Sequence, residues 1–360
     1  MTERANNLSD QRQRLRTRFT DLVGIEHPVI QEGLGPYKTV HLAAAVSNAG
    51  GLGTISIPGM TEGVEQGSAS MRRYIEEACA LTDRPLAVNV PVGTADGEEL
   101  PFSAAYVKAV VDALADPAIA ARLKVITTSA GPPDVVRPLI EGSGLIHMHK
   151  IGGTRQALRA QADGVDVILA SGYEAGGHTH ARPVHTFILA PNVVQAVDLP
   201  VVLAGGIRDG ATLAAALALG VDAVAMGTRF VASHDNPDWH PAYAERIIAA
   251  REGDDIVFQA IYGPSRALHT RGIDDLAEII AANTMDVHEL TAWKDVRLIG
   301  AQRDGKLEEG LMPCGQVASA INDLIHVAEF VPGIVEDAIA VLDGLRSAVV
   351  TAEPSPSVPR

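Results

Sequence analysis

The chain has 360 residues and a formal net charge of −15. Apolar residues make up 47% of the sequence but aromatic residues only 4%, so the core must consist mainly of aliphatic side chains, as in buried parallel strands and the helices that cover them. The acidic balance argues against nucleic acid or an anionic membrane as partner, and the 34 glycines and 21 prolines exclude a coiled coil or a helical bundle.

The N-terminal segment, residues 1–17, is predicted to be a solvated arm with a short basic stretch. It has no apolar segment typical of a signal peptide, and no apolar run in the chain is long enough to cross a bilayer. The two cysteines, Cys79 and Cys314, are too few for a disulfide framework and fit a reducing compartment. We therefore expect a cytoplasmic protein.

Eight short apolar runs, rich in valine and isoleucine, follow the arm. They are Pro28–Gln31, Leu52–Ile55, Leu86–Val90, Val125–Ser129, Leu145–His149, Val165–Ala170, Pro200–Ala204 and Ala223–Gly227. Alanine-rich stretches with helical spacing lie between them, at Thr39–Asn48, Ser70–Leu81, Ala104–Leu114, Thr154–Ala162 and Ala211–Leu219. Eight strand–helix units in sequence predict a TIM (β/α)8 barrel over residues 18–233, with its sites at the C-terminal ends of the strands. A doubly wound open sheet is the structural alternative.

The pattern changes after the eighth run. Residues 234–310 are more charged and are predicted to be an inserted, smaller segment that lies over the barrel mouth. Leu311–Leu345 returns to an amphipathic helical pattern, so residues 311–350 are expected to pack on the barrel as helices. Residues 351–360 have the composition of a disordered tail.

Glycines end the seventh and eighth predicted strands. Gly205 and Gly206 follow the seventh strand, and Gly227 and Thr228 follow the eighth. These two loops are neighbours in a barrel, and glycine lets backbone N–H groups approach a phosphate without a Cβ in the way. Two such corners on consecutive strands, where barrels hold phosphate, predict a phosphate site. Tight strand–helix turns without a ligand are the alternative.

Histidines gather at the ends of the fifth and sixth strands. The loop Ser171–His180 holds three glycines, an acid and two histidines, which indicates backbone wrapped around a ligand with His178 as a proton donor beside it. His147 and His149 alternate along the fifth strand, so they share one face, which we expect to be the barrel mouth. A structural role for these histidines is the alternative.

Other chemistries find less support. His147, His149, His178 and His180 could converge on a metal, but the carboxylate and histidine pattern of a zinc enzyme is missing, so no metal is predicted. A Gly-x-Ser-x-Gly elbow for serine hydrolysis is absent from the sequence. Cys79 falls in a helical stretch, and Cys314 has no base partner nearby in the sequence.

Four segments resemble the nitronate monooxygenase family, formerly called 2-nitropropane dioxygenases, whose superfamily includes flavin-dependent enoyl-ACP reductases. They are Ala43–Ile55 (AAAVSNAGGLGTI), Glu174–His178 (EAGGH), Ala204–Gly210 (AGGIRDG) and Gly227–Val231 (GTRFV). The resemblance runs from about Arg16 to about Asp323. EAGGH and GTRF together are specific to the family, whereas AGGI also occurs in other phosphate-binding barrels.

The resemblance implies non-covalently bound FMN, a small-molecule substrate, dioxygen as co-substrate and a homodimer. By this resemblance the flavin ring lies near Gln31, Gly33, Asn89 and Lys150, the ribityl phosphate lies near Gly176, Gly177, Gly205, Gly206, Gly227 and Thr228, and Gln316 makes a further flavin contact. His149, with Lys150 and Arg155 after it, reproduces the spacing that the resemblance assigns to the catalytic base of the monooxygenases. His178 matches the histidine that the reductases use near their substrate.

Three positions depart from the family pattern. Leu34 replaces a methionine after Gln-x-Gly, which leaves a mainly backbone contact intact. His180 stands where the family often has glycine and narrows the pocket, and Val317 replaces a common serine near the flavin. The last two weaken the substrate assignment.

The resulting hypothesis is oxidation of alkyl nitronates or nitroalkanes by FMN and dioxygen, with His149 as the base. The main rival is an NAD(P)H-dependent FMN reductase of quinones or enoyl thioesters on the same fold, and the third possibility is a flavin-binding barrel without turnover. A barrel of the IMP dehydrogenase kind would need a cysteine within Ser171–His180, and this loop has none.

Overall fold

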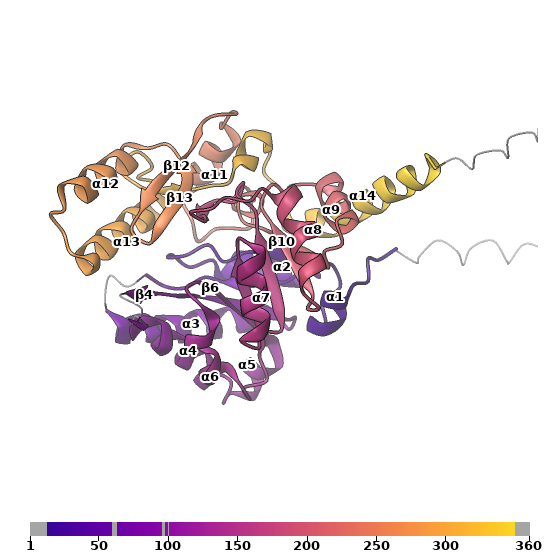
Figure 1. Ribbon diagram of the computed structural model, residues 1–360, viewed down its shortest axis with the longest axis horizontal. Coiled ribbons are helices and arrows are strands. Elements are labelled where there is room, and N and C mark those ends of the chain that lie inside the picture. The colour runs from indigo at the N-terminus through magenta and orange to yellow at the C-terminus, as the bar shows by residue number, and fades with distance from the viewer. Residues whose placement is uncertain (1–12, 60–62, 96–97, 100, 350–360) are drawn as a thin grey trace, which may run out of the picture.

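The computed structural model describes residues 13–59, 63–95, 98–99 and 101–349, and its centre is a ring of eight parallel strands (Figure 1). In chain order these strands are β1 (Val29–Gln31), β2 (Gly53–Ile55), β3 (Leu86–Val92), β6 (Leu123–Ala130), β7 (Ile146–Ile151), β8 (Val167–Ser171), β10 (Val201–Ala204) and β11 (Ala223–Met226). Their order in the sheet is β1-β11-β10-β8-β7-β6-β3-β2, and a parallel bridge between Ile30 and Leu52 closes the ring. The predicted TIM barrel is confirmed, and the open sheet is excluded.

The strands alternate between two buried surfaces. One set of side chains fills the interior of the barrel, including Ile30, Ala87, Val125, Met148, Leu169, Val202 and Ala225. The other set packs outward against the helices, as Val88 and Ile168 do. Because both faces are covered, these strands appear in the sequence as continuous apolar runs.

Helices surround the barrel. They are α2 (Val40–Asn48), α3 (Val64–Leu81), α4 (Pro101–Ala113), α5 (Pro117–Arg122), α6 (Arg137–Ile140), α7 (Thr154–Ala162), α8 (Thr186–Ala196) and α9 (Gly210–Ala218). The short helix α1 (Arg18–Val23) packs Phe19 and Val23 against the interior cluster. All five expected helical stretches are helical, with α3 starting six residues earlier than expected. Smaller elements are β4 (Thr94–Ala95), β5 (Glu98–Glu99), η1 (Pro133–Val135) and α10 (Thr228–Val231).

Residues 234–310 form a separate layer at the end of the barrel where the strands finish (Figure 1). The layer holds α11 (Pro241–Ile248), β12 (Asp255–Ala260), β13 (Gly263–Leu268), α12 (Arg271–Ala282) and α13 (Val287–Asp304). β13 pairs with β12 and also with β9 (Gly177–His178), a short strand in the loop after β8. This pairing fixes the histidine loop of the barrel to the inserted layer.

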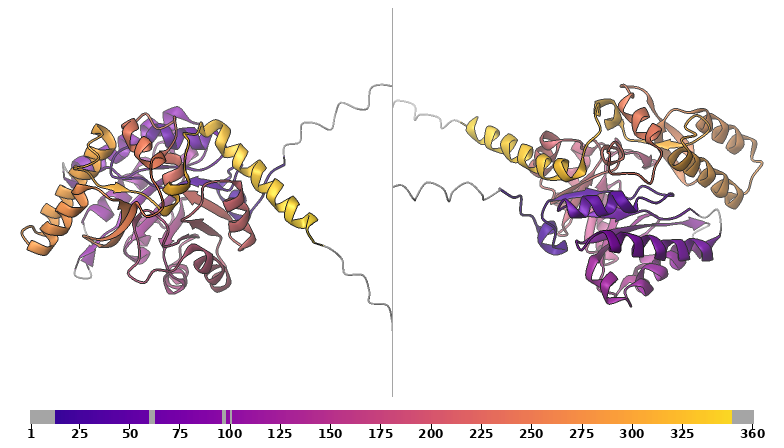
Figure 2. Two further views of the ribbon diagram at one scale, coloured as in Figure 1. Left: turned by 90° about the horizontal axis from the view of Figure 1, so that it is seen from above. Right: turned by 180° about the vertical axis from the view of Figure 1, so that it is seen from behind.

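The C-terminal segment is only partly the helix that its pattern predicts. Residues 311–326 contain β14 (Met312–Pro313), which pairs with β13, and the 3-10 helix η2 (Gln316–Ala320). Strand pairing next to Pro313 and Gly315 replaces the expected helix here. The α-helix is α14 (Val327–Ser347), which packs against α9 and α2 and so takes the place of the eighth barrel helix before it extends beyond the barrel (Figure 2).

The predicted tail, residues 351–360, and most of the predicted arm lie outside the described residues. Residues 13–17 of the arm are described, and there Arg14 pairs with Glu26 and Arg16 with Asp21. Within the described ranges, no helix combines the length and apolar character that crossing a membrane requires.

Candidate active site

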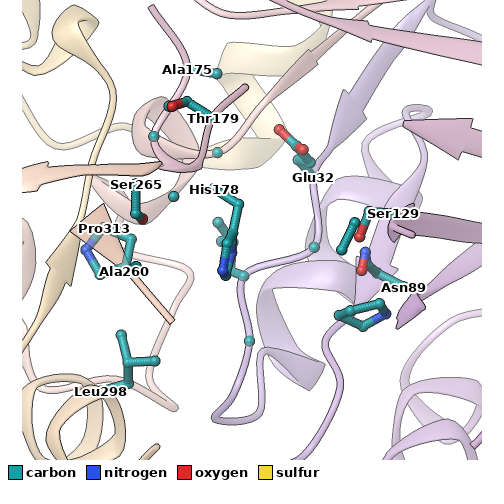
Figure 3. A pocket seen from close by; sticks show the side chains of 18 of the residues that line it. Glu32, Asn89, Ser129, Ala175, His178, Thr179, Ala260, Ser265, Leu298 and Pro313 are labelled. Atoms are coloured by element: carbon teal, nitrogen blue, oxygen red, sulfur yellow. The ribbon is translucent and has the colours of Figure 1, made fainter. Parts of the chain in front are cut away.

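A cavity of about 750 Å³ lies between the C-terminal ends of the barrel strands and the inserted layer (Figure 3). Its volume falls within the range of about 300 to 1,000 Å³ that small-molecule and cofactor sites occupy. The loops after most barrel strands form one wall, and β12, β13, α12 and α13 form the other.

One end of the cavity is lined by glycine backbone. Gly177, Gly205 and Gly206 have φ angles of +72°, +103° and +78°, which side-chain-bearing residues rarely adopt. A Cβ added to Gly176 would lie 2.5 Å from the backbone carbon of Cys314, so the two loops can approach this closely only with glycine there. Gly227 and Thr228 line the same end. The structure thus brings the predicted glycine corners together.

The backbone N–H of Gly206 has no protein acceptor among the described residues, and space is open on the side where a Cβ would stand. Such an N–H can donate to a ligand oxygen. Thr228 Oγ1 accepts a hydrogen bond from the Gly315 N–H at 3.0 Å, which leaves its own hydroxyl proton for another acceptor. This end of the cavity has the donor set of a phosphate site.

Glu174 of the EAGGH segment fixes the loop. Its carboxylate accepts hydrogen bonds from the Thr186 N–H at 3.0 Å, from the Thr186 hydroxyl at 2.7 Å and from His185 at 3.2 Å. Burial acts to raise the pKa of Glu174, but these hydrogen bonds outweigh it and hold the pKa below its usual value. The Glu174 carbonyl also accepts from the Gln316 N–H at 3.0 Å. Glu174 therefore positions the glycines that follow it.

The floor of the cavity comes from β1, β3 and β7. Lys150 points inward and pairs with Glu32, and both side chains line the cavity. Gly33 lies against Asn89, because a Cβ at Gly33 would be only 2.5 Å from the Asn89 Cβ. Of the residues expected near a flavin ring, Gly33, Asn89 and Lys150 are therefore together at the cavity surface (Figure 3 labels Asn89 and Glu32).

Two predicted cofactor residues lie elsewhere. Gln31 is fully buried, and its side chain accepts a hydrogen bond from the Thr54 N–H at 3.0 Å, which links β1 to β2. The side chain of Gln316 is exposed on η2, and it is its neighbours Gly315 and Val317 that line the cavity. Neither glutamine side chain is part of the cavity wall.

His178 faces into the cavity from β9 (Figure 3). Its side chain is exposed to the open space of the cavity, and the cavity walls lie around it. This enclosure lowers the pKa of His178 to about 4, and the charges of Lys294 and Lys150 act in the same direction. The imidazole is therefore neutral near pH 7 and able to accept a proton.

The expectation that His147 and His149 face the barrel mouth is wrong. Met148 packs in the barrel interior and Lys150 lines the cavity, so the pleat of β7 turns the two histidines toward the outside of the barrel. His147 is fully buried and His149 is 5% exposed. The Thr128 hydroxyl lies 2.7 Å from His147 Nε2 and 2.8 Å from His149 Nδ1, so it bridges the two rings.

This burial keeps both outward histidines neutral. It lowers the pKa of His147 to about 3 and that of His149 to about 4. Their neutral rings serve the hydrogen bonds to Thr128, and neither ring lines the cavity. His149 is thus not placed to act on a substrate there.

His180, a departure from the family pattern, lies beyond the end of β7. Its ring packs so closely on Gly152 that a Cβ at Gly152 would lie 1.5 Å from His180 Cδ2. The His180 side chain also lines the cavity, and burial lowers its pKa. His180 therefore forms part of this edge of the cavity, and its narrowing of the pocket stays a prediction.

Sequence reasoning missed the side chains that the inserted layer contributes. Tyr262 stands at the turn between β12 and β13, and its ring centroid is 6.4 Å from that of His178. Phe258, Lys294 and Leu298 also line the cavity from this side. The sequence of α13 has almost no amphipathic pattern, so it gave no signal of which of its side chains face the cavity.

The residues present fit a flavin. The glycine end offers backbone donors and close approach for a phosphate, and a second group of cavity residues, Gly33, Asn89 and Lys150, lies where the ring of such a cofactor is expected. His178 and His180 are the described histidines that line this cavity.

Comparison with known proteins agrees with this site. A family model described as nitronate monooxygenase matches residues 16–337. The "(3aS,4S,5R,7aS)-5-hydroxy-7a-methyl-1-oxo-octahydro-1H-indene-4-carboxyl-CoA dehydrogenase" of Rhodococcus jostii is 31% identical over 92% of this chain and 98% of its own length. A probable nitronate monooxygenase of Staphylococcus saprophyticus is 31% identical over 74% of this chain and 82% of its own length.

A solved structure extends the likeness to three dimensions. FabK from Thermotoga maritima superposes with a TM-score of 0.81 at 34% identity, covering 93% of this chain and 100% of the FabK chain. The sequence match, the fold and the glycine-lined cavity agree with one another. This chain belongs to the nitronate monooxygenase family and is a flavin-dependent oxidoreductase that acts on a small molecule.

Proposed function

We propose that the chain binds FMN and transfers a hydride between the flavin and an acyl thioester, with His178 as the acid–base group at the substrate α-carbon. The observation that carries this proposal is the placement of one neutral imidazole, His178, in the same cavity as the glycine-lined end. His149, the base expected from the sequence, is outside the cavity.

In this proposal the phosphate of FMN binds at Gly176, Gly205, Gly206 and Thr228, and the ring lies beside Gly33 and Asn89. FMN supplies the site that accepts or donates the hydride. The chain's own residues supply position and proton transfer. Pairing of β9 with β13 holds the His178 backbone in place.

Size and similarity support a thioester as substrate. The cavity of about 750 Å³ has a wall of apolar side chains from the inserted layer, among them Phe258, Ile261 and Leu298, which suits an acyl group larger than a nitroalkane. The Rhodococcus jostii relative, named as the dehydrogenase of a carboxyl-CoA compound, covers the chain over almost its whole length. The probable Staphylococcus saprophyticus nitronate monooxygenase covers 74% of it.

Oxidation of nitronates with dioxygen is the second candidate, because the family model carries that description. A nitroalkane also has an acidic α-carbon, so His178 is again the group in position to receive its proton. In this case too, His178 replaces His149 as the proposed base.

Anaerobic mixing tests the two candidates. Under the thioester proposal, a saturated acyl-CoA bleaches the oxidised flavin, or an enoyl-CoA restores the absorbance of flavin that NADH or NADPH has reduced. A separate assay in air measures oxygen consumption with propionate-3-nitronate. If thioesters leave the anaerobic spectrum unchanged while the nitronate drives oxygen consumption, the second candidate replaces the first. A purified protein that binds no FMN would contradict both.

A further inference from the structure

We infer that Lys294, supported by Tyr262, forms an oxyanion-binding subsite that holds the substrate oxygen on which negative charge develops when His178 takes the α-proton. This inference rests on the proposed function and adds a substrate-binding residue from the inserted layer. The site residues predicted from the sequence all lie in the barrel, residues 18–233, or in the C-terminal segment, residues 311–350. Tyr262 and Lys294 instead lie in the inserted layer, residues 234–310.

The three side chains are close together. Lys294 Nζ lies 5.7 Å from the centroid of the Tyr262 ring, and that ring lies 6.4 Å from the imidazole of His178. The Tyr262 ring is thus close to both the ammonium and the imidazole, and all three residues line the cavity. A ligand that binds against Tyr262 therefore has both the imidazole and the ammonium close by.

The ring and the helix that carries the lysine are fixed in place. The Tyr262 hydroxyl and Thr291 Oγ1 share a hydrogen bond of 2.9 Å, and the Thr291 hydroxyl donates to the Val287 carbonyl at 2.7 Å. Leu298 is one helical turn beyond Lys294 on α13 and points into the cavity in Figure 3. Lys294 and Leu298 therefore share the helix face that lines the cavity.

Lys294 has donors left for a ligand. Its side chain is 15% exposed, and its Nζ lies 3.5 Å from Asp295 Oδ1, longer than a charge-assisted hydrogen bond of about 2.7 to 2.9 Å. Lys150, the other lysine that acts on His178, is in direct contact with the carboxylate of Glu32. The ion pair of Lys294 with Asp295 is longer than that of Lys150 with Glu32, so among the described residues Lys294 is the one of these two lysines with more of its ammonium left for a substrate oxygen.

The chemistry requires such a group. When His178 removes the α-proton, the electron pair of the C–H bond forms the carbon–carbon double bond of an enolate, and the carbonyl π pair moves onto the oxygen. That oxygen becomes negative while the imidazole becomes positive. A cation beside that oxygen stabilises the enolate more than the neutral thioester, which lowers the barrier to proton removal.

Two CoA ligands separate this role from general binding. Acetoacetyl-CoA has an acidic α-carbon and can bind as its enolate, whereas butyryl-CoA carries the same CoA portion and remains neutral. Dissociation constants are measured on flavin-loaded wild type, Lys294→Met, Lys294→Arg and Lys306→Met. Lys306 is exposed and lies outside the cavity wall, so its variant removes the same charge from the same layer.

We expect Lys294→Met to weaken acetoacetyl-CoA binding about 10- to 100-fold, the size of a lost hydrogen bond to a charged group, and to leave butyryl-CoA unaffected. Lys294→Arg should recover much of the loss, and Lys306→Met should bind both ligands like wild type. In nuclear magnetic resonance titrations, Lys294→Met should raise the pKa of His178, because the lysine charge lowers it.

Equal weakening of both ligands, or no weakening, overturns the subsite while leaving the proposed function intact. If wild-type protein binds neither ligand and neither thioester changes the flavin spectrum, the thioester function fails and the subsite fails with it.

Discussion

The two walls of the cavity are built differently. The barrel wall presents backbone, with glycines at Gly176, Gly205 and Gly206 whose conformation or close contacts exclude a side chain. The wall of the inserted layer presents side chains, among them Phe258 and Lys294. The difference teaches that a shared cofactor can be recognised by backbone geometry, which tolerates little change, and a particular substrate by side chains that can vary.

The largest effect should come from the residue between the two walls. Changing His178 to Asn removes the proposed acid–base group, and general acid–base catalysis contributes about 10²- to 10⁴-fold in rate. We expect kcat for the thioester to fall by that amount while FMN content stays at the wild-type level. Steady-state kinetics and the absorption spectrum measure the two quantities.

His149→Asn is the matched control, since His149 has a similarly lowered pKa but faces away from the cavity. Its turnover should remain close to wild type, with a loss of stability from the broken Thr128 contact. A rate loss at His149 as large as that at His178 would contradict our placement of the base.

The barrel wall is tested by adding one methyl group. Gly176→Ala brings a Cβ within 2.5 Å of the Cys314 backbone, and this contact is between backbone segments that have no flexible end to move. We expect FMN affinity to fall about 10- to 100-fold, corresponding to roughly 1.4 to 2.8 kcal/mol. Fluorescence titration of the apoprotein with FMN gives the dissociation constant.

Gly333→Ala serves as its control, because an added Cβ on this α14 residue meets nothing within 4 Å. FMN affinity should stay unchanged, and the helix should gain about 0.5 to 1 kcal/mol in stability. Unchanged FMN affinity in Gly176→Ala would show that the glycine corner does not hold the cofactor.

A substitution in the wall formed by the inserted layer should change the affinity for substrate and not the affinity for FMN. Phe258→Ala removes an aromatic ring from the cavity, and lost burial of such a side chain costs about 1.5 to 3 kcal/mol. We expect KM for long acyl thioesters to rise about tenfold, with short thioesters and FMN unaffected. Val257→Ala, at a neighbouring exposed position outside the cavity, is the control for β12. An equal loss of affinity for FMN and for the thioester would contradict the proposed difference between the two walls.

The last expected effect concerns the dependence of stability on pH. In the folded state the pKa of His147 is about 3 and that of His149 is about 4, whereas the unfolded value of both is about 6.5. Between these values the unfolded chain binds more protons, so the free energy of unfolding falls as pH drops from about 6.5 toward about 4. Urea unfolding of His147→Gln should show a shallower decline over this range, and an unchanged slope would argue against the buried pair as its cause.

Much of the barrel could be predicted because its strands are covered on both faces and appear as continuous apolar runs. The glycine corners could be predicted because they follow the seventh and eighth runs directly. The side of β7 that faces the barrel interior could not be predicted. Alternation shows that His147 and His149 share one side and that Met148 and Lys150 share the other, but it does not show which side is the interior.

The cavity residues of the inserted layer could not be predicted from local sequence patterns for a different reason. Tyr262 and Lys294 acquire their place through the pairing of β9 with β13, which joins segments far apart in the chain. The same limit applies to Gln31: the sequence shows it as the last residue of a strand, but not that its amide is used to join β1 and β2. Long-range pairing decides these roles.

The position of α14 has a consequence for how the protein is made. This helix occupies the gap between α9 and α2, yet it follows its strand β11 by about a hundred residues of chain, a separation that slows closure because distant contacts form late. During synthesis on the ribosome, the apolar surface that α14 will cover stays open until the inserted layer has emerged. That surface is therefore exposed to aggregation for longer than in a barrel whose last helix follows directly.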